Sequence, residues 1–70
     1  ILAVAHKAQL RTRLAAMARE MGAADPDALG DGLLLLLEGA FVSSQLFGQG
    51  GPAGRVAQMA DKLIEAHLAR

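Results

Sequence analysis

The feature that most constrains this 70-residue chain is a helical segment, about residues 26–48, that is apolar almost all the way round. On a helical wheel the polar side chains of this region fall in one strip only about 40° wide. They are Asp27, Asp31, Glu38, Gln45 and Gln49. A helix of this kind is a buried helix, because each large side chain left in water forgoes about 1.5–3 kcal/mol of burial.

The apolar circumference of this segment has three parts. Large side chains cover one broad side: Leu29, Leu33, Leu36, Leu37, Phe41 and Phe47. Leu35, Val42 and Leu46 flank the polar strip on the other side, and small residues lie between the two sides at Ala28, Gly32, Gly39 and Ser43. Glycine inside a helix costs about 1 kcal/mol relative to alanine, so the small residues predict close approach of another helix.

Glycine and proline divide the chain into three helices. Gly22 and the Asp25–Pro26 pair form the first break, and residues 48–52, rich in glycine with Pro52, form the second. Glycine ends helices and proline fits their first turn, so we expect helices over about 2–21, 26–48 and 52–69, with Asp25 as an N-cap. Strand patterns are absent, and the sequence therefore predicts an all-α fold.

Composition and charge exclude several classes of protein. Seven Lys and Arg balance seven Asp and Glu, which excludes a globally basic nucleic-acid binder and an acidic tail. The absence of cysteine excludes disulfides and thiolate chemistry. The longest apolar run, Leu33–Leu37, falls far short of the roughly 18 residues of a membrane span. The chain begins at Ile1 without a signal-peptide pattern, so we expect a piece of an intracellular, cytoplasmic protein.

Size points to an incomplete core. A chain of about 60 residues buries only about 60% of its unfolded surface and is marginal alone. Because nothing in this sequence indicates a disulfide or metal staple, we expect the apolar middle helix to be covered by another copy, by the rest of a parent protein, or by both.

The residues from Met21 to Val42, MGAADPDALGDGLLLLLEGAFV, resemble the C-terminal regulatory domain of TetR-family (tetracycline-repressor-like) transcription regulators. The shared features are an Ala/Arg-rich helix, a turn with an Asp-Pro pair, a Leu-rich helix with the acidic-Gly-Ala triplet Glu38–Ala40, a glycine/proline break and a final Ala-rich amphipathic helix. The resemblance covers nearly all 70 residues.

The resemblance implies that residues 1–70 are a fragment of a C-terminal ligand-binding and dimerisation domain. In that family the last two long helices pair with their copies in a second subunit as a four-helix bundle. The preceding helices enclose a pocket for a small effector. An N-terminal helix-turn-helix binds operator DNA; this part is absent from the sequence, so operator binding is attributed to the parent protein.

On this basis we expect a homodimer in which three helices per chain contribute to a two-fold bundle. The predicted interface residues are Leu36, Gly39, Ala40, Ser43, Phe47, Val56, Met59, Ala60, Leu63, Ile64 and His67. A possible effector-pocket wall comprises Leu14, Met17, Met21, Leu33, Leu37 and Phe41, of which the last three are expected to face the chain's own core. Which side of the middle helix faces the partner stays open, because both sides are apolar.

The polar residues favour structural roles. His6 and His67 lie 61 positions apart with no spaced partner, so we expect neither a metal site nor a cofactor. Glu38 is expected to be solvated or paired with Arg11, Arg13 or Arg19. No convergent catalytic constellation is visible, which predicts a protein that is not an enzyme. The alternative function is a generic helical oligomerisation module of an enzyme or scaffold protein.

Overall fold

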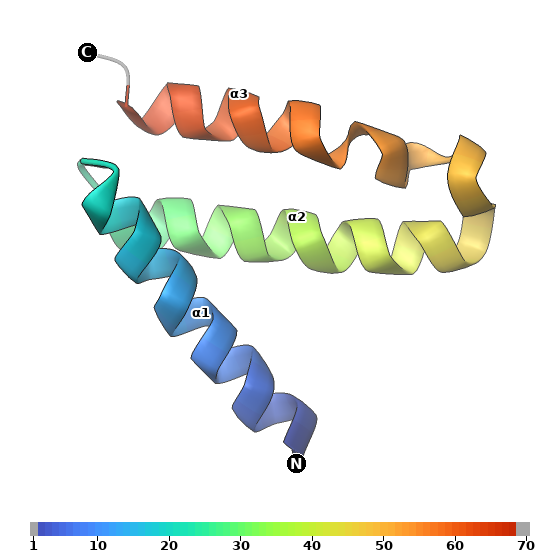
Figure 1. The fold of residues 1–70 in the computed structure, drawn as a ribbon, viewed down its shortest axis with the longest axis horizontal. Helices are drawn as coiled ribbons and strands as arrows, with labels where there is room; N and C mark the ends of the chain where they lie inside the picture. The colour runs from blue at the N-terminus through green and yellow to red at the C-terminus, as the bar shows by residue number, and fades with distance from the viewer. Residues whose placement is uncertain (1, 69–70) are drawn as a thin grey trace.

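A computed structural model describes residues 2–68 of the chain, with side chains from residue 6 onward. Within that range the chain forms three α-helices and no strand. They are α1 (Leu2–Glu20), α2 (Pro26–Phe47) and α3 (Val56–Leu68), with two short 3₁₀ helices, η1 (Gly48–Gly50) and η2 (Pro52–Arg55), between α2 and α3. The all-α class is confirmed. Figure 1 shows α3 running beside α2, while α1 meets the N-terminal part of α2 at an angle.

The turns follow the predicted signals. The Asp25 carboxylate accepts a hydrogen bond from the Ala28 backbone N–H at 3.2 Å, which confirms the N-cap of α2, and Pro26 occupies its first turn. Gly22 ends α1 with a positive φ of 90°. The Ala23 N–H then donates to the Ala18 carbonyl at 3.1 Å, which satisfies one of the free acceptors at the end of the helix.

The predicted helix over 52–69 differs at its start. Residues 52–55 form the 3₁₀ helix η2, and α-helical geometry begins only at Val56. Tighter 3₁₀ turns are frequent at helix N-termini, and Gly54 lowers the helical preference of this turn. The predicted last residue, 69, lies outside the described residues. Gly48, with a φ of 70°, ends α2 one residue before the predicted boundary.

The core lies where α1 crosses α2. Its buried members are Leu14, Ala18, Leu29 and Leu33. Gly30 allows the crossing, because a Cβ atom at this position would lie 2.8 Å from the Ala15 nitrogen and 2.9 Å from its Cα. The two backbones are therefore in direct contact. Several half-buried apolar residues pack around this core: Leu10, Ala23, Leu34, Ala60, Leu63 and Ile64.

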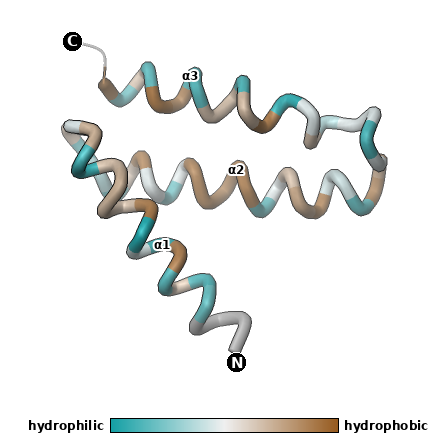
Figure 2. Tube along the Cα trace, in the orientation of Figure 1, coloured by the Kyte–Doolittle hydropathy of each residue, from teal (hydrophilic) through white to brown (hydrophobic). Residues whose placement is uncertain are grey.

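The described helices form a single layer. The molecule measures 35 × 32 × 12 Å, so its short dimension is that of one helix, about 10–12 Å. Its radius of gyration is 13.0 Å, whereas a compact chain of this length has about 11 Å. Apolar positions recur along the whole of α2 in Figure 2. Because domains are built from two or more packed layers, a single layer leaves such a helix incompletely covered.

The contact at Gly30 generates a prediction. Gly30→Ala is expected to lower the free energy of unfolding by about 1–3 kcal/mol, because its methyl group meets backbone atoms that cannot move aside. Chemical denaturation followed by circular dichroism measures the change.

Gly32→Ala is the matched control. A Cβ atom at Gly32 meets only the Cδ2 tip of Leu63, at 2.7 Å, and this flexible side chain can shift. We expect stability within about 1 kcal/mol of wild type, since the helix propensity gained offsets the rearrangement. Equal losses in the two variants would contradict the role assigned to Gly30.

Candidate interaction surfaces

Most of the predicted dimer-interface residues on α2 lie against α3 of the same chain. Four of them, together with two predicted interface residues on α3, line a groove of about 280 Å³ between α2, η2 and the start of α3, which they share with Pro52 and Arg55. The six are Leu36, Gly39, Ala40, Ser43, Val56 and Met59. The structure thus brings these residues together, and it does so within one copy of the chain.

The predicted interface residues further along α3 also face α2. Ala60, Leu63 and Ile64 pack against the core, and Leu63 lies over Gly32. The close approach predicted from the small residues of α2 therefore occurs at Gly32, and the approaching helix is the chain's own α3. Contact of these three residues with a second copy stays a prediction.

The two remaining predicted interface residues lie outside this cluster. Phe47, at the C-terminal end of α2, is exposed, and His67 is half-buried near the end of α3. Contact of either residue with a second copy also stays a prediction.

The predicted effector-wall residues are divided by the α1–α2 crossing. Leu14 and Leu33 are buried in the core, whereas Met17 and Met21 are exposed. The expectation that Leu33, Leu37 and Phe41 all face the chain's own core is right for Leu33 only. Leu37 is 46% exposed and Phe41 63% exposed, because α1 diverges from α2 beyond the crossing (Figure 1).

A further apolar surface follows the C-terminal half of α2. Leu35, Val42 and Leu46 are 71%, 53% and 72% exposed, and Gly39 has nothing within 4 Å of the position of a Cβ atom. We call these four residues the outer stripe. Their intervals of four, three and four residues place them on one helix face. This spacing was readable in the sequence, but the predicted interface included only Gly39 of the four.

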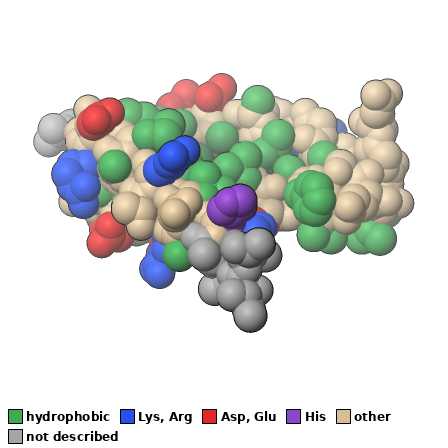
Figure 3. Space-filling model, turned by 60° about the horizontal axis from the view of Figure 1, so that its bottom comes forward, with side chains coloured by type: hydrophobic (Ala, Val, Ile, Leu, Met, Phe, Trp, Pro, Cys, Tyr) green, Lys and Arg blue, Asp and Glu red, His purple; other side chains and the backbone are tan. Residues whose placement is uncertain are grey.

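Figure 3 shows where apolar side chains gather on one face of the molecule. Hydrophobic side chains lie along its middle and at its lower right, while most charged side chains lie in its left half. The sequence explains this distribution, because residues 39–54 contain no charged side chain. One large part of the molecule is therefore both apolar and uncharged.

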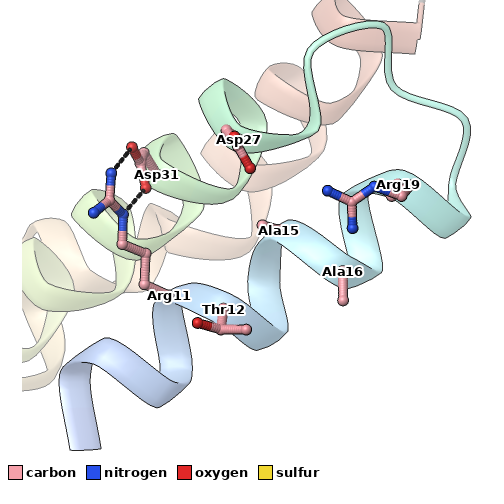
Figure 4. A pocket seen from close by; sticks show the side chains of 7 residues that line it. All are labelled: Arg11, Thr12, Ala15, Ala16, Arg19, Asp27 and Asp31. Atoms are coloured by element: carbon pink, nitrogen blue, oxygen red, sulfur yellow. Dashed lines mark hydrogen bonds and ion pairs between the residues drawn. The ribbon is translucent and has the colours of Figure 1, made fainter. Parts of the chain in front are cut away.

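The polar strip of α2 faces α1. Arg11 donates from Nε to Asp31 Oδ1 at 2.7 Å and from Nη2 to Oδ2 at 2.9 Å, a bidentate pair (Figure 4). Lys7 Nζ donates to Glu38 Oε2 at 2.6 Å. The expected arginine partner of Glu38 is therefore wrong: Lys7 lies one turn before Arg11 in α1, and Glu38 lies two turns after Asp31 in α2.

A polar hollow of about 430 Å³ lies beside the bidentate pair, between α1 and the start of α2 (Figure 4). It is lined by Arg11, Thr12, Ala15, Ala16, Arg19, Asp27 and Asp31. Two arginines balance two aspartates, so the hollow has no net charge with which to select an ion. The Thr12 hydroxyl donates to the Ala8 carbonyl at 3.1 Å, so no neighbouring base holds it as a nucleophile. Among the described residues, the lining of this hollow therefore brings together no nucleophile and base.

The segment Pro26–Gly50, α2 with η1, is long and apolar enough to cross a membrane. Core helices of soluble proteins have the same length and composition. The paired Asp31 and Glu38 lie within the segment.

No known protein family, no curated protein and no solved structure matches this chain. A functional assignment therefore depends on the chain's own residues and on the surfaces described above.

The bidentate pair gives a pH prediction. The hydrogen bond from Arg11 holds the pKa of Asp31 below its ordinary value. A carboxyl group whose pKa is lowered by folding stabilises the fold above its unfolded pKa, about 3.9, and loses that contribution as pH falls below it. We expect Asp31→Asn to lower stability near pH 7 and to flatten its decline in acid.

The measurement is thermal unfolding between pH 3 and pH 7. Asp61→Asn, which changes an exposed aspartate on α3, is the control and should retain the wild-type decline in acid. An Asp31→Asn variant with the wild-type pH profile would show that the pair contributes nothing to folding.

Proposed function

We propose that this chain is the regulatory and dimerisation part of a TetR-like transcriptional regulator. The observation that carries the proposal is the exposure of α2. This Leu-rich helix, which bears the TetR-like residues Glu38–Ala40, lies in a single layer with large apolar side chains exposed. The order of the helices along the chain is also that expected of the family.

The proposed partner is a second copy of the chain. A helix with exposed apolar side chains on several sides is unfavourable in water, and association of two copies removes part of that surface. Operator DNA would be bound by a helix-turn-helix in the parent protein, which would act in the cytoplasm, where operator DNA lies.

The proposed regulation uses the other exposed residues. Met17 near the end of α1, Met21 in the turn that follows it, and Leu37 and Phe41 of α2 are exposed apolar side chains on the two sides of the α1–α2 crossing. A small apolar effector bound to either pair would bias the angle between α1 and α2. Because α2 also belongs to the proposed dimer, such a change would alter the relative pose of two DNA-binding domains.

A generic helical oligomerisation module is the second candidate. The same exposed surface of α2 favours it, since association of copies requires neither an effector pocket nor DNA. In this case the parent protein would carry a catalytic or scaffold domain in place of a helix-turn-helix.

The deciding experiment is made on the parent protein. We expect a helix-turn-helix with basic first turns upstream of Ile1, and dimeric parent protein that selects a two-fold symmetric site from random duplex DNA. If the parent instead has a catalytic domain upstream and selects no DNA site, the result would contradict the regulator and favour the oligomerisation module.

Phe41→Ala tests the proposed effector wall in the parent protein. Loss of one large apolar contact of about 1.5–3 kcal/mol should weaken binding of an apolar probe, the dye anilinonaphthalene sulfonate, by tenfold or more. Fluorescence titration measures the dye affinity.

Leu68→Ala, on α3, is the control and should leave dye affinity unchanged. Equal dye affinity of wild type and Phe41→Ala would remove Phe41 from the wall.

A further inference from the structure

We infer that the outer stripe of α2 (Leu35, Gly39, Val42 and Leu46) is the surface on which a second copy of this chain docks. The inference rests on the dimer of the proposed function. It replaces most of the predicted interface residues by a different face of α2.

The first argument is that neither neighbouring helix covers the three large side chains of the outer stripe, although its Gly39 also lines the groove beside α3. On one side of it, α1 is joined to α2 by the Asp31 and Glu38 ion pairs. On the other side, α3 is in contact at Gly32, where Leu63 lies. Between these contacts the large side chains of the stripe are more than half exposed.

The second argument is the pattern of the stripe. Intervals of four, three and four residues are those of the a and d positions of paired helices, which form a continuous apolar row along one face. Gly39 interrupts the row of large side chains, and nothing lies within 4 Å of a Cβ atom built there. A second helix can therefore approach closely at this point, with Leu35 on one side and Val42 and Leu46 on the other.

The third argument is the amount of surface. The chain exposes 5249 Å², whereas a folded monomer of this mass exposes about 4,200 Å². The surplus of about 1,000 Å² by this scaling is close to the roughly 800 Å² that each partner buries in a standard protein interface. An interface with one further copy of the chain would remove about this much surface.

The fourth argument is that the outer stripe can pair with its own copy. In a two-fold contact the same patch meets itself, and a charge close to the symmetry axis would face a like charge. The outer stripe carries no charge, and the segment 39–54 contains none. The adjacent carboxylates of Asp31 and Glu38 are neutralised by Arg11 and Lys7 of their own chain.

Sedimentation equilibrium of the chain tests the inference. The wild type is expected to be a dimer. Leu35→Lys and Leu46→Lys should each weaken association at least about 100-fold, since every substitution occurs twice in a symmetric dimer. Ser44→Lys is the control, because Ser44 is exposed and lies roughly opposite the stripe on α2. It should associate like the wild type.

A label experiment covers the case in which a lysine variant does not fold. The chain contains no cysteine, so a spin label can be placed singly at Val42→Cys or at Ser44→Cys. The distance between labels in the two copies should be short at position 42 and longer by about two helix diameters, roughly 20 Å, at position 44. Equal distances would overturn the inference.

Three other outcomes would also overturn it: a monomeric wild type, association that persists in both stripe variants, or equal weakening by Ser44→Lys. Stripe-dependent binding of the monomer to phosphatidylcholine vesicles would make a lipid surface the occupant instead. Failure of the proposed function can be distinguished from failure of this inference. A parent without DNA-binding activity leaves a stripe-dependent dimer intact, while a DNA-binding parent that dimerises without the stripe removes only this inference.

Discussion

The direct backbone contact between α1 and α2 determines most of what this chain exposes. Gly30 lets α1 come against α2 near its N-terminal end, and Leu14, Leu29 and Leu33 become buried there. Because a contact this close is confined to the crossing, α1 leaves the rest of α2 uncovered. Beyond the crossing only α3 runs beside α2, on one side. The exposed leucines and phenylalanines of the C-terminal half of α2 are a consequence of where the crossing lies.

The angle of that crossing is held by few interactions. Among the residues whose side chains are described, the core has four buried side chains, and two exposed ion pairs join α1 to the polar strip. Exposed ion pairs contribute about 0–1 kcal/mol and are weakened by salt. A small change in the surroundings of α1 can therefore alter its angle to α2 at little cost. This property suits a regulatory domain, in which binding at one place has to change geometry at another.

The sequence predicted the helices well and their arrangement poorly, for a physical reason. Gly22, Asp25 and Pro26 mark the start of α2 through local backbone geometry and capping, which depend on neighbouring residues alone. Which side of α2 is buried depends on where other helices cross it. An apolar pattern that runs round the whole helix does not indicate which side is buried. Leu37 and Phe41 were therefore expected in the core, and they are exposed. Gly30 gave no signal because it is one of several small residues in α2.

Three faces of α2 have different surroundings. Its small residue Gly32 is occupied by α3, the large side chains of its outer stripe are exposed, and Leu37 and Phe41 lie roughly opposite that stripe. A single partner cannot cover two opposite faces of one helix. If the stripe is buried in a dimer, Leu37 and Phe41 still face outward, beside the divergence of α1. Dimerisation and effector binding would then use separate faces of the same helix. A rotation of α2 about its axis would change the geometry of both faces.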